Sequence, residues 1–294
     1  MSQNKTPFKT RFKEWFDERI RQLKKNLNII RELVKRNIKV QYRNSALGAI
    51  WTVLNPLLNM LVMFVVFGAI FNYSETDKTY ALYLLCGNVI FGMMRTATTQ
   101  SLTTLVANRG LLTKNRISYS VFPLSLNLTA VVNFLFSCIA LLAVMVVVQL
   151  IDVANPALVG PVFSWNILYV LAMLPAFFLF NYGISLLLSA LYVFFRDVQH
   201  LYNVFLTMWT YFTPIFYKTD RFENKTWGPV VVWMLENLNP MYYFVDYFRA
   251  AIYDVSANGA AMPSVWPLYL IGLLFFVIGG TVFLITKRKF IFYI

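Results

Sequence analysis

Long uncharged runs of apolar residues alternate with short basic clusters along this chain, and the first such boundary is the clearest. From Ser45 to Phe71 no side chain carries a charge near neutral pH. At a rise of about 1.5 Å per residue, a helix over Ser45–Phe71 reaches about 40 Å. The hydrocarbon core of a bilayer is about 30 Å thick, so the pattern predicts that the chain enters a membrane here.

Five more runs of the same kind follow the first one. They predict further membrane-spanning helices, with approximate ends, at Tyr80–Val106, Val121–Ile151, Trp165–Phe195, Gln199–Tyr217 and Trp266–Thr286. Six crossings return the carboxyl terminus to the side on which the amino terminus lies. The sequence therefore predicts an all-α integral membrane protein with six transmembrane helices.

The segment before the first span has a different pattern. Its apolar residues recur at steps of four and three, opposite a face rich in Lys and Arg: Phe12, Phe16, Ile20, Leu23, Leu27, Ile30, Val34 and Ile38. This spacing predicts an amphipathic helix that lies in the membrane interface and does not cross it. Its basic residues nearest the first span are Arg31, Lys35, Arg36, Lys39 and Arg43. The chain then divides into an interface helix, residues 1–44, and a membrane domain, residues 45–294.

The distribution of basic residues predicts the orientation. Half of the 26 Lys and Arg residues precede the first span, and most of the others fall in segments on the same side. Short loops rich in Lys and Arg stay on the cytoplasmic side during insertion. Both termini are therefore expected in the cytoplasm, with the protein in the cytoplasmic (inner) membrane. The first 30 residues show no apolar core followed by a cleavage site, so we expect no removable signal peptide.

Composition supports a membrane protein and narrows the partners. Apolar residues make up 59% of the 294 positions and charged residues 13%, far from the quarter that is usual in soluble domains. The net charge of +13 is concentrated before the first span, which favours anionic membrane lipids or a cytoplasmic partner over nucleic acid. Cys86 and Cys138 lie in apolar runs without metal-ligand spacing, so we expect packing residues and no metal site.

The long outer segment before the last span, Lys218–Val265, is rich in aromatic residues. We expect two short amphipathic helices there that re-enter the outer leaflet. Asn239 can cap the second of them, with Pro240 as its first residue. We take four of its residues as a candidate outer gate, with the two charged ones expected to pair at helical spacing: Tyr243, Asp246, Tyr247 and Arg249.

The fifth expected span carries an aromatic stripe, whose members recur at steps of three and four: Tyr202, Phe205, Trp209, Phe212 and Phe216. At this spacing all five rings project from one helical face. Such a face could line a transport pathway, because the C–H faces of sugar rings stack on aromatic rings. Helix packing or lipid contact explains the same pattern equally well.

The sequence shows no catalytic constellation. The GxxxxGK[ST], HExxH, CxxC and GxSxG motifs are all missing, and the single histidine, His200, lies in a turn. Arg95 is the one Lys, Arg, Asp or Glu within the predicted spans, and we expect it to pair with backbone carbonyls or to extend toward an interface. Because it has no carboxylate partner within the spans, coupling to an ion gradient is not favoured. Energy is expected to come from another polypeptide.

Four pieces of the chain resemble the permease subunits of type-2 ABC exporters, especially those for lipid-linked polysaccharides such as O-antigens, capsules and teichoic acids. These pieces are Glu32–Pro56, the NRGLLTKN loop (Asn108–Asn115) leading to Val121–Ser125, Phe194–His200 and Asn239–Tyr253. The resemblance covers nearly the whole chain. One departure is that many relatives carry Phe-Pro soon after the loop lysine, where this chain has Ile117-Ser118.

The resemblance implies a homodimer with two separate nucleotide-binding ATPase subunits docked below it. ATP and Mg²⁺ would be bound by those subunits, and this chain would hold no cofactor of its own. The docking loop would transmit force through five residues: Arg109, Leu111, Leu112, Lys114 and Arg116. An ordinary positive-inside anchor is the alternative interpretation of the same loop.

The leading hypothesis is therefore a channel subunit, not an enzyme, that exports lipid-linked polysaccharide. One alternative keeps the family and changes the cargo to a drug, haem or lipid. Another is a membrane enzyme that acts on lipid-linked sugars through the outer acids Glu223, Glu236, Asp246 and Asp254.

Overall fold

The structure is a computed structural model that describes residues 26–43, 45–48, 50–71, 79–114, 117–154, 161–219, 222 and 226–293. Every regular element within these residues is helical, which confirms the all-α part of the expected fold class. In chain order the elements are a helix over residues 26–41, α2 (Ile50–Phe71), α4 (Tyr80–Ala107), α5 (Arg109–Lys114), α6 (Val121–Ala154), the 3-10 turn η1 (Trp165–Leu168), α7 (Tyr169–Phe194), α8 (Val198–Phe212), α10 (Gly228–Asn237), α11 (Pro240–Arg249), the π-helical turn η2 (Ala250–Asp254), α12 (Val255–Ala257), α13 (Trp266–Thr286) and α14 (Phe290–Tyr293).

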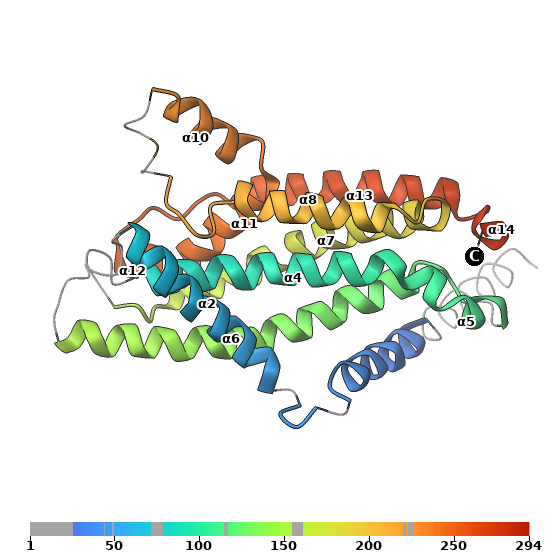
Figure 1. The fold of residues 1–294 in the computed structure, drawn as a ribbon, viewed down its shortest axis with the longest axis horizontal. Helices are drawn as coiled ribbons and strands as arrows, with labels where there is room; N and C mark the ends of the chain where they lie inside the picture. Colours follow the sequence, from blue (N-terminus) through green and yellow to red (C-terminus); the bar gives the residue numbers. More distant parts are fainter. Residues whose placement is uncertain are drawn as a thin grey trace, which may run out of the picture.

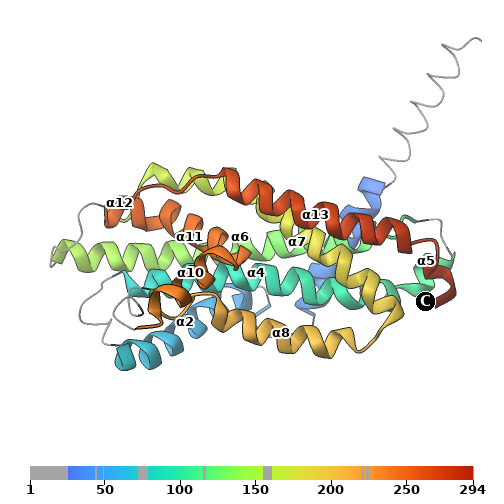
Figure 2. The ribbon, with the colours of Figure 1, turned by 90° about the horizontal axis from the view of Figure 1, so that it is seen from above.

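The long helices α4, α6, α7, α8 and α13 lie side by side in an elongated bundle, and α2 crosses its face obliquely (Figure 1). Seen from above, α8 and α13 lie along opposite edges of the bundle, with α4 between them (Figure 2). One end of the bundle carries α5 and α14, and the other carries α10, α11 and α12. The segments expected on the two sides of a membrane therefore lie at opposite ends of the structure.

Four of the expected spans form helices that are both long and apolar enough to cross a membrane: Ile50–Gly68, Val121–Val153, Trp165–Phe194 and Trp266–Thr286. Helix α4 has the length, with 28 residues, but it carries polar side chains such as Asn88 and Arg95. Its neighbours α2, α6 and α7 bury most of its residues. Polar side chains can occur on α4 because most of its surface meets protein and not lipid.

Helix α8 is shorter than the predicted span Gln199–Tyr217, because it ends at Phe212. Thr213, the next residue, is extended (φ −89°, ψ 128°) and precedes Pro214. A proline disfavours the helical conformation in the residue before it, so the sequence itself contains the stop. The 15 residues of α8 rise about 22 Å, less than the hydrocarbon thickness.

The carbonyl groups that follow α8 lie outside the helix, and two of them accept hydrogen bonds from tyrosines of α4. The Tyr80 hydroxyl donates to the Phe216 carbonyl oxygen at 2.8 Å, and the Tyr83 hydroxyl reaches the Pro214 carbonyl oxygen at 2.8 Å. Non-helical backbone is tolerated at membrane depth only where protein or water satisfies it. These two tyrosines therefore make the interruption after α8 possible.

Helix α2 begins five residues later than the predicted Ser45. Gly48 has φ +52°, in the left-handed region that favours glycine, and its N–H donates to Ser45 Oγ at 3.1 Å. Residues 45–48 therefore form a turn, and regular helix begins at Ile50.

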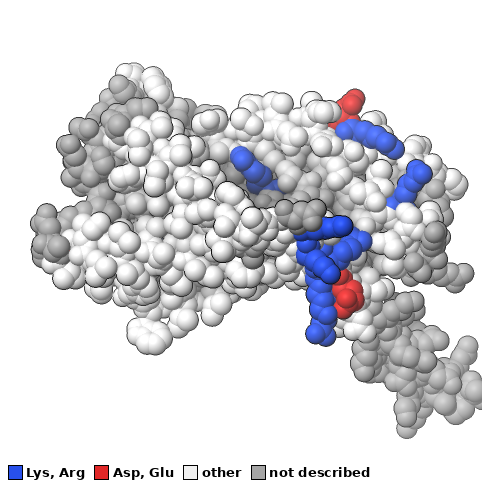
Figure 3. All heavy atoms as spheres, turned by 60° about the horizontal axis from the view of Figure 1, so that its bottom comes forward, with Lys and Arg blue, Asp and Glu red and all other residues white. Residues whose placement is uncertain are grey.

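The helix over residues 26–41 is amphipathic, although its buried face differs in part from the predicted one. Ile30 is buried as expected, Leu33 is buried as well, and Leu27 is 62% exposed. The buried pair packs at the end of the bundle against residues such as Leu105 and Phe122. Its basic residues are exposed. Figure 3 shows several basic side chains close together on a face that is otherwise mostly uncharged, with a few others apart from them. The predicted apolar positions from Phe12 to Leu23 lie outside the described residues.

The outer segment contains the short helices α10 and α11, which differ in their surroundings. Helix α11 is embedded, and most of its residues are buried. Helix α10 projects from the bundle (Figure 1) and exposes Val230 and Trp233 by 63% and 57%.

Helices α7 and α13 pack so closely that glycine is needed at the contact. A Cβ atom on Gly279 would meet the carbonyl oxygen of Gly183, and one on Gly183 would meet the backbone of Phe275. A Cβ atom on Gly272 would lie 2.5 Å from the Ala176 carbonyl oxygen. Backbone atoms cannot move aside as a flexible side chain can, so these glycines determine the distance between the two helices.

We predict that Gly279→Ala destabilises the protein by about 1–3 kcal/mol, because the new methyl group forces α13 away from α7. Gly280→Ala is the matched control, since a Cβ atom there meets nothing within 4 Å. It should be neutral or should stabilise by up to about 1 kcal/mol through helix propensity. Thermal unfolding of the two variants in detergent compares them, and equal midpoints would contradict the packing described above.

Candidate functional site

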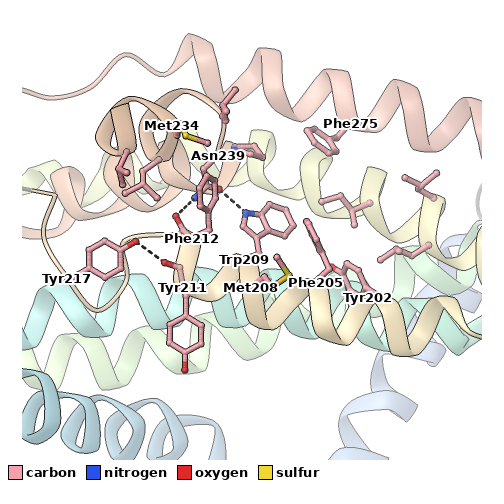
Figure 4. Close-up of a pocket in the computed structure, with 17 residues that line it drawn as sticks. Tyr202, Phe205, Met208, Trp209, Tyr211, Phe212, Tyr217, Met234, Asn239 and Phe275 are labelled. Atoms are coloured by element: carbon pink, nitrogen blue, oxygen red, sulfur yellow. Dashed lines mark hydrogen bonds between the residues drawn. The ribbon is translucent and has the colours of Figure 1, made fainter. Parts of the chain in front are cut away.

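Helix α8 borders two cavities that differ in polarity. The first, of about 1090 Å³, is lined almost entirely by apolar residues from α7, α8, α10 and α13 (Figure 4). Four members of the aromatic stripe line it: Tyr202, Phe205, Trp209 and Phe212. Phe216 does not, because α8 has ended and the helical register is lost. Its ring stacks on Phe67 at a centroid distance of 5.3 Å.

The stripe residues on α8 have two roles. Tyr202 and Trp209 are buried, and the Trp209 ring contacts Phe91 and Phe180 at centroid distances of 6.3 and 6.4 Å. Phe205 is 50% exposed. Packing therefore accounts for some of the stripe, whereas Phe205 offers an open aromatic face to the cavity.

Asn239 connects this cavity wall to the outer segment. Its side-chain oxygen accepts hydrogen bonds from Met241 N at 3.1 Å, the predicted helix cap, and from Trp209 Nε1 at 2.8 Å. Its amide nitrogen donates to the Phe212 carbonyl oxygen at 3.2 Å and to Thr213 Oγ1 at 2.9 Å. One buried amide thus holds the end of α8 and the beginning of α11 together (Figure 4).

The second cavity, of about 450 Å³, lies between α2, α4 and α8 and has a mixed lining, with many more polar groups than the first; we call it the polar cavity. Amides and hydroxyls from all three helices line it: Asn59, Asn88, Thr96, Thr207 and Thr210. A smaller cavity of about 210 Å³ shares Asn59, Asn88 and Thr96 with it and continues to Tyr42 and Asn133. The Tyr211 ring also borders the polar side and in Figure 4 points away from the apolar cavity.

Arg95 lies in the wall of the polar cavity, near the middle of α4. Its Nη2 donates to Thr210 Oγ1 at 2.7 Å, and its guanidinium carbon lies 5.6 Å from the centroid of the Phe91 ring. The expected pairing with backbone carbonyls is wrong, because the partner in the structure is a side-chain hydroxyl on α8. The residue is exposed in this single chain.

At the outer end, Arg249 is buried and hydrogen-bonds to backbone carbonyl oxygens. Its Nη2 donates to the carbonyl oxygens of Tyr83 and Pro214 at 3.2 and 2.9 Å, and the guanidinium carbon lies 3.4 Å from the Tyr83 ring centroid. Glycine at position 87 provides the space for this guanidinium group, because a Cβ atom there would lie 2.9 Å from Arg249 Nη2. The predicted ion pair with Asp246 is wrong: no such pair within 4 Å occurs among the described residues. The carbonyl groups after α8 compete successfully for the guanidinium.

The other candidate gate residues on α11 differ in burial. Tyr247 is buried, whereas Tyr243 and Asp246 are half-buried. Burial raises the pKa of the Asp246 carboxyl, although the positive charge of Arg249 acts in the opposite direction. Asp246 borders a polar hollow of about 240 Å³ with Lys218 and Asp254. Of the four outer acids, Asp246 and Asp254 therefore border one hollow. Glu236 does not border it and accepts a hydrogen bond from the Tyr242 hydroxyl at 3.2 Å, and Glu223 lies outside the described residues.

At the opposite end, the expected docking loop contains the short helix α5. Arg109 and Leu111 are exposed there, while Leu112 packs partly against the buried residues at this end of the bundle. The Lys114 side chain and Arg116 lie outside the described residues. Arg36 Nη2 donates to Asn108 Oδ1 at 3.1 Å, which ties the amino-terminal helix to the residue before α5.

The remaining basic residues of the amino-terminal helix are exposed: Arg31, Lys35, Lys39 and Arg43. Lys35 pairs with Glu32 at 3.0 Å. The amino-terminal helix and α5 together form a partly basic surface at this end of the structure.

Comparison with known proteins identifies the family. Residues 29–253 match the family model described as "ABC-2 type transporter". The chain is 26% identical to the O-antigen export system permease protein RfbA of Myxococcus xanthus over 235 residues, which is 80% of this chain and 84% of that protein. It is also 26% identical to a protein of the same name from Klebsiella pneumoniae over 274 residues, 91% of this chain and 97% of that protein. It is 22% identical to the polysialic acid transport protein KpsM of Escherichia coli over 255 residues, 82% of this chain and 90% of that protein.

We predict that Asn239→Ala lowers the free energy of unfolding by about 2–4 kcal/mol, because the Trp209 N–H and the Phe212 carbonyl lose a buried partner. Asn237→Ala is the control, since Asn237 is exposed and donates only to Trp233 within α10. It should cost less than about 1 kcal/mol. Thermal unfolding in detergent measures both variants, and similar losses would show that Asn239 does not join the two segments.

Proposed function

The chain belongs to the ABC-2 type transporter family, and on this premise we propose that it is the membrane permease subunit of an ABC exporter that moves polysaccharide out of the cytoplasm. The observation that carries this proposal is the near full-length match to O-antigen export permeases, which covers 97% of one of them. The resemblance to a polysialic acid transport protein supports the same class of cargo. The cargo is proposed to be a glycan linked to a lipid carrier.

The proposed topology has six spans, with both termini in the cytoplasm, in the cytoplasmic membrane. Helix α4 adds a fifth crossing, since its 28 residues rise about 42 Å. Helix α8 adds the sixth together with the non-helical residues 213–217, where the carbonyl oxygens of Pro214 and Phe216 accept hydrogen bonds from α4. Residues 1–44 form the interface helix of this arrangement and residues 45–294 its membrane domain.

The proposed assembly contains a second copy of this chain and two ATPase subunits that bind ATP with Mg²⁺. The absence of a phosphate-binding loop from the sequence is consistent with ATP hydrolysis in another polypeptide. The ATPase subunits would dock on α5 and on the amino-terminal helix, whose exposed basic residues lie at the same end of the structure. Leu112, which packs into the bundle, then transmits a displacement of α5 to α4 and α6.

The proposed pathway uses both faces of α8. The polar cavity offers amides and hydroxyls that can exchange hydrogen bonds with sugar hydroxyls. The apolar cavity offers the exposed ring of Phe205 and the half-buried ring of Phe212 to the apolar parts of the cargo. Tyr202 and Trp209 hold this wall in place through their buried contacts. At the outer end, α11 with Tyr243, Asp246, Tyr247 and Arg249 forms the gate.

We predict that Arg109→Glu reduces the amount of ATPase subunit that copurifies with the permease by about tenfold, because a charge of the wrong sign then faces the docked partner. Arg196→Glu is the control, because Arg196 is equally exposed but lies in a different cytoplasmic turn. Copurification and glycan export in a deletion strain are measured for both variants. Unchanged copurification and export with Arg109→Glu would exclude α5 as the docking site.

We also predict that Phe205→Ala and Phe212→Ala each lower glycan export by about two- to tenfold, because a stacking surface is lost. Val204→Ala is the control on the same helix, since Val204 is exposed and does not line the apolar cavity. Surface glycan is quantified in a deletion strain at equal permease levels. Normal export by both phenylalanine variants would show that the aromatic stripe is not part of the transport pathway.

A further inference from the structure

Arg95 occupies a position that a bilayer alone does not tolerate. It lies about 22 Å along α4 from Tyr80 and about 18 Å from Ala107, too far from either end for its side chain to reach an interface. A charged side chain near the bilayer centre costs several kcal/mol and normally faces a bundle interior or a water-filled cavity. The exposed side of Arg95 must therefore face water or protein in the membrane, and not lipid.

The surroundings of Arg95 do not neutralise its charge. A guanidinium group has five N–H donors, and the hydrogen bond observed for this side chain goes to the neutral Thr210 hydroxyl. The Phe91 ring lies alongside and holds the group without removing its charge. The lining of the polar cavity, within the described residues, contains amides, hydroxyls and apolar groups but no carboxylate. The cavity thus presents a positive charge whose remaining donors meet no carboxylate among the residues that the structure describes.

We propose that Arg95 is an oxyanion-binding residue of the export pathway and that the cargo is an acidic polysaccharide, with carboxylate or phosphate groups along the polymer. This inference rests on the proposed function. An anionic sugar loses hydration as it passes the middle of the membrane, and a planar guanidinium forms two parallel hydrogen bonds with such a group. A neutral polymer would gain nothing from this charge. Each copy of the chain supplies one such residue to the shared pathway.

A structural role for Arg95 makes a different prediction from an anion-binding role. Its hydrogen bond to Thr210 joins α4 to α8. If the role of Arg95 were only to hold these helices together, Thr210→Val and Arg95→Gln would have equal effects. Anion binding depends on the charge, so it should survive in Thr210→Val and be lost in Arg95→Gln. The two variants together separate the two roles.

The experiment uses the full-length permease in nanodiscs of phosphatidylcholine and two probes that share one sugar backbone, with the carboxylates charged in one and esterified in the other. These are a hexamer of galacturonate and the same hexamer with every carboxyl methyl-esterified. Calorimetry should give about tenfold or tighter binding of the acidic form by the unchanged protein. Arg95→Gln should bind both forms alike, and Arg95→Lys should keep part of the preference. Thr210→Val and the charge control Arg196→Gln should keep all of it, with folding of each variant verified by thermal unfolding.

Equal binding of the two forms by the unchanged protein, or a preserved preference in Arg95→Gln, would overturn the proposal that Arg95 binds an acidic cargo. Neither result would contradict the proposed glycan export. Failure to bind either form would contradict the glycan pathway itself. An oxyanion could also come from the phosphates of a lipid carrier or from a membrane lipid. Inorganic pyrophosphate tests the first source, and nanodiscs that contain phosphatidylglycerol test the second. Arg95-dependent binding of pyrophosphate or of that lipid, without a preference for the acidic hexamer, would assign Arg95 to a carrier or lipid phosphate and overturn the proposal.

Discussion

A polar group in the hydrocarbon core of a membrane must find its partner within the protein, because neither water nor lipid supplies one. The carbonyl groups that follow α8 meet this requirement through the hydroxyls of Tyr80 and Tyr83 and the guanidinium of Arg249. These three side chains allow α8 to stop short and the chain to continue toward the outer segment. Removing such a partner would leave buried carbonyl oxygens without donors, which is why the outer end is built around them.

The same requirement determines where polar side chains lie in the bundle. Polar side chains collect on α4, which its neighbours enclose, and in the cavity between α2, α4 and α8. Helix α8 then has an apolar cavity on one side and a polar one on the other. A cargo with a sugar part and a lipid part can meet a suitable surface for each at this helix. In the proposed topology, the end where α5 adjoins the amino-terminal helix faces the cytoplasm, and an ATPase can act on the permease there.

Much of this arrangement could be predicted from the sequence, and the exceptions share a cause. Uncharged runs predicted the long helices, and α13 has the predicted ends, Trp266 and Thr286. The Asn239 cap was also predictable, because it depends on adjacent residues. Its bond to Trp209 was not, nor was the preference of Arg249 for distant carbonyls over Asp246, because both depend on segments brought together only by folding. The early end of α8 could have been predicted from Thr213-Pro214, but the apolar pattern continued past it.

The central claim is that this chain forms a passage through the membrane and receives its energy from a separate ATPase. The direct measurement is transport in liposomes that contain the purified permease, with lipid-linked glycan added on the side that bears α5. Glycan that reaches the opposite face is quantified by its accessibility to a glycan-cleaving enzyme. We predict transport only when the ATPase subunit and hydrolysable ATP are both present. Sustained transport against a glycan gradient by the permease alone would contradict the claim.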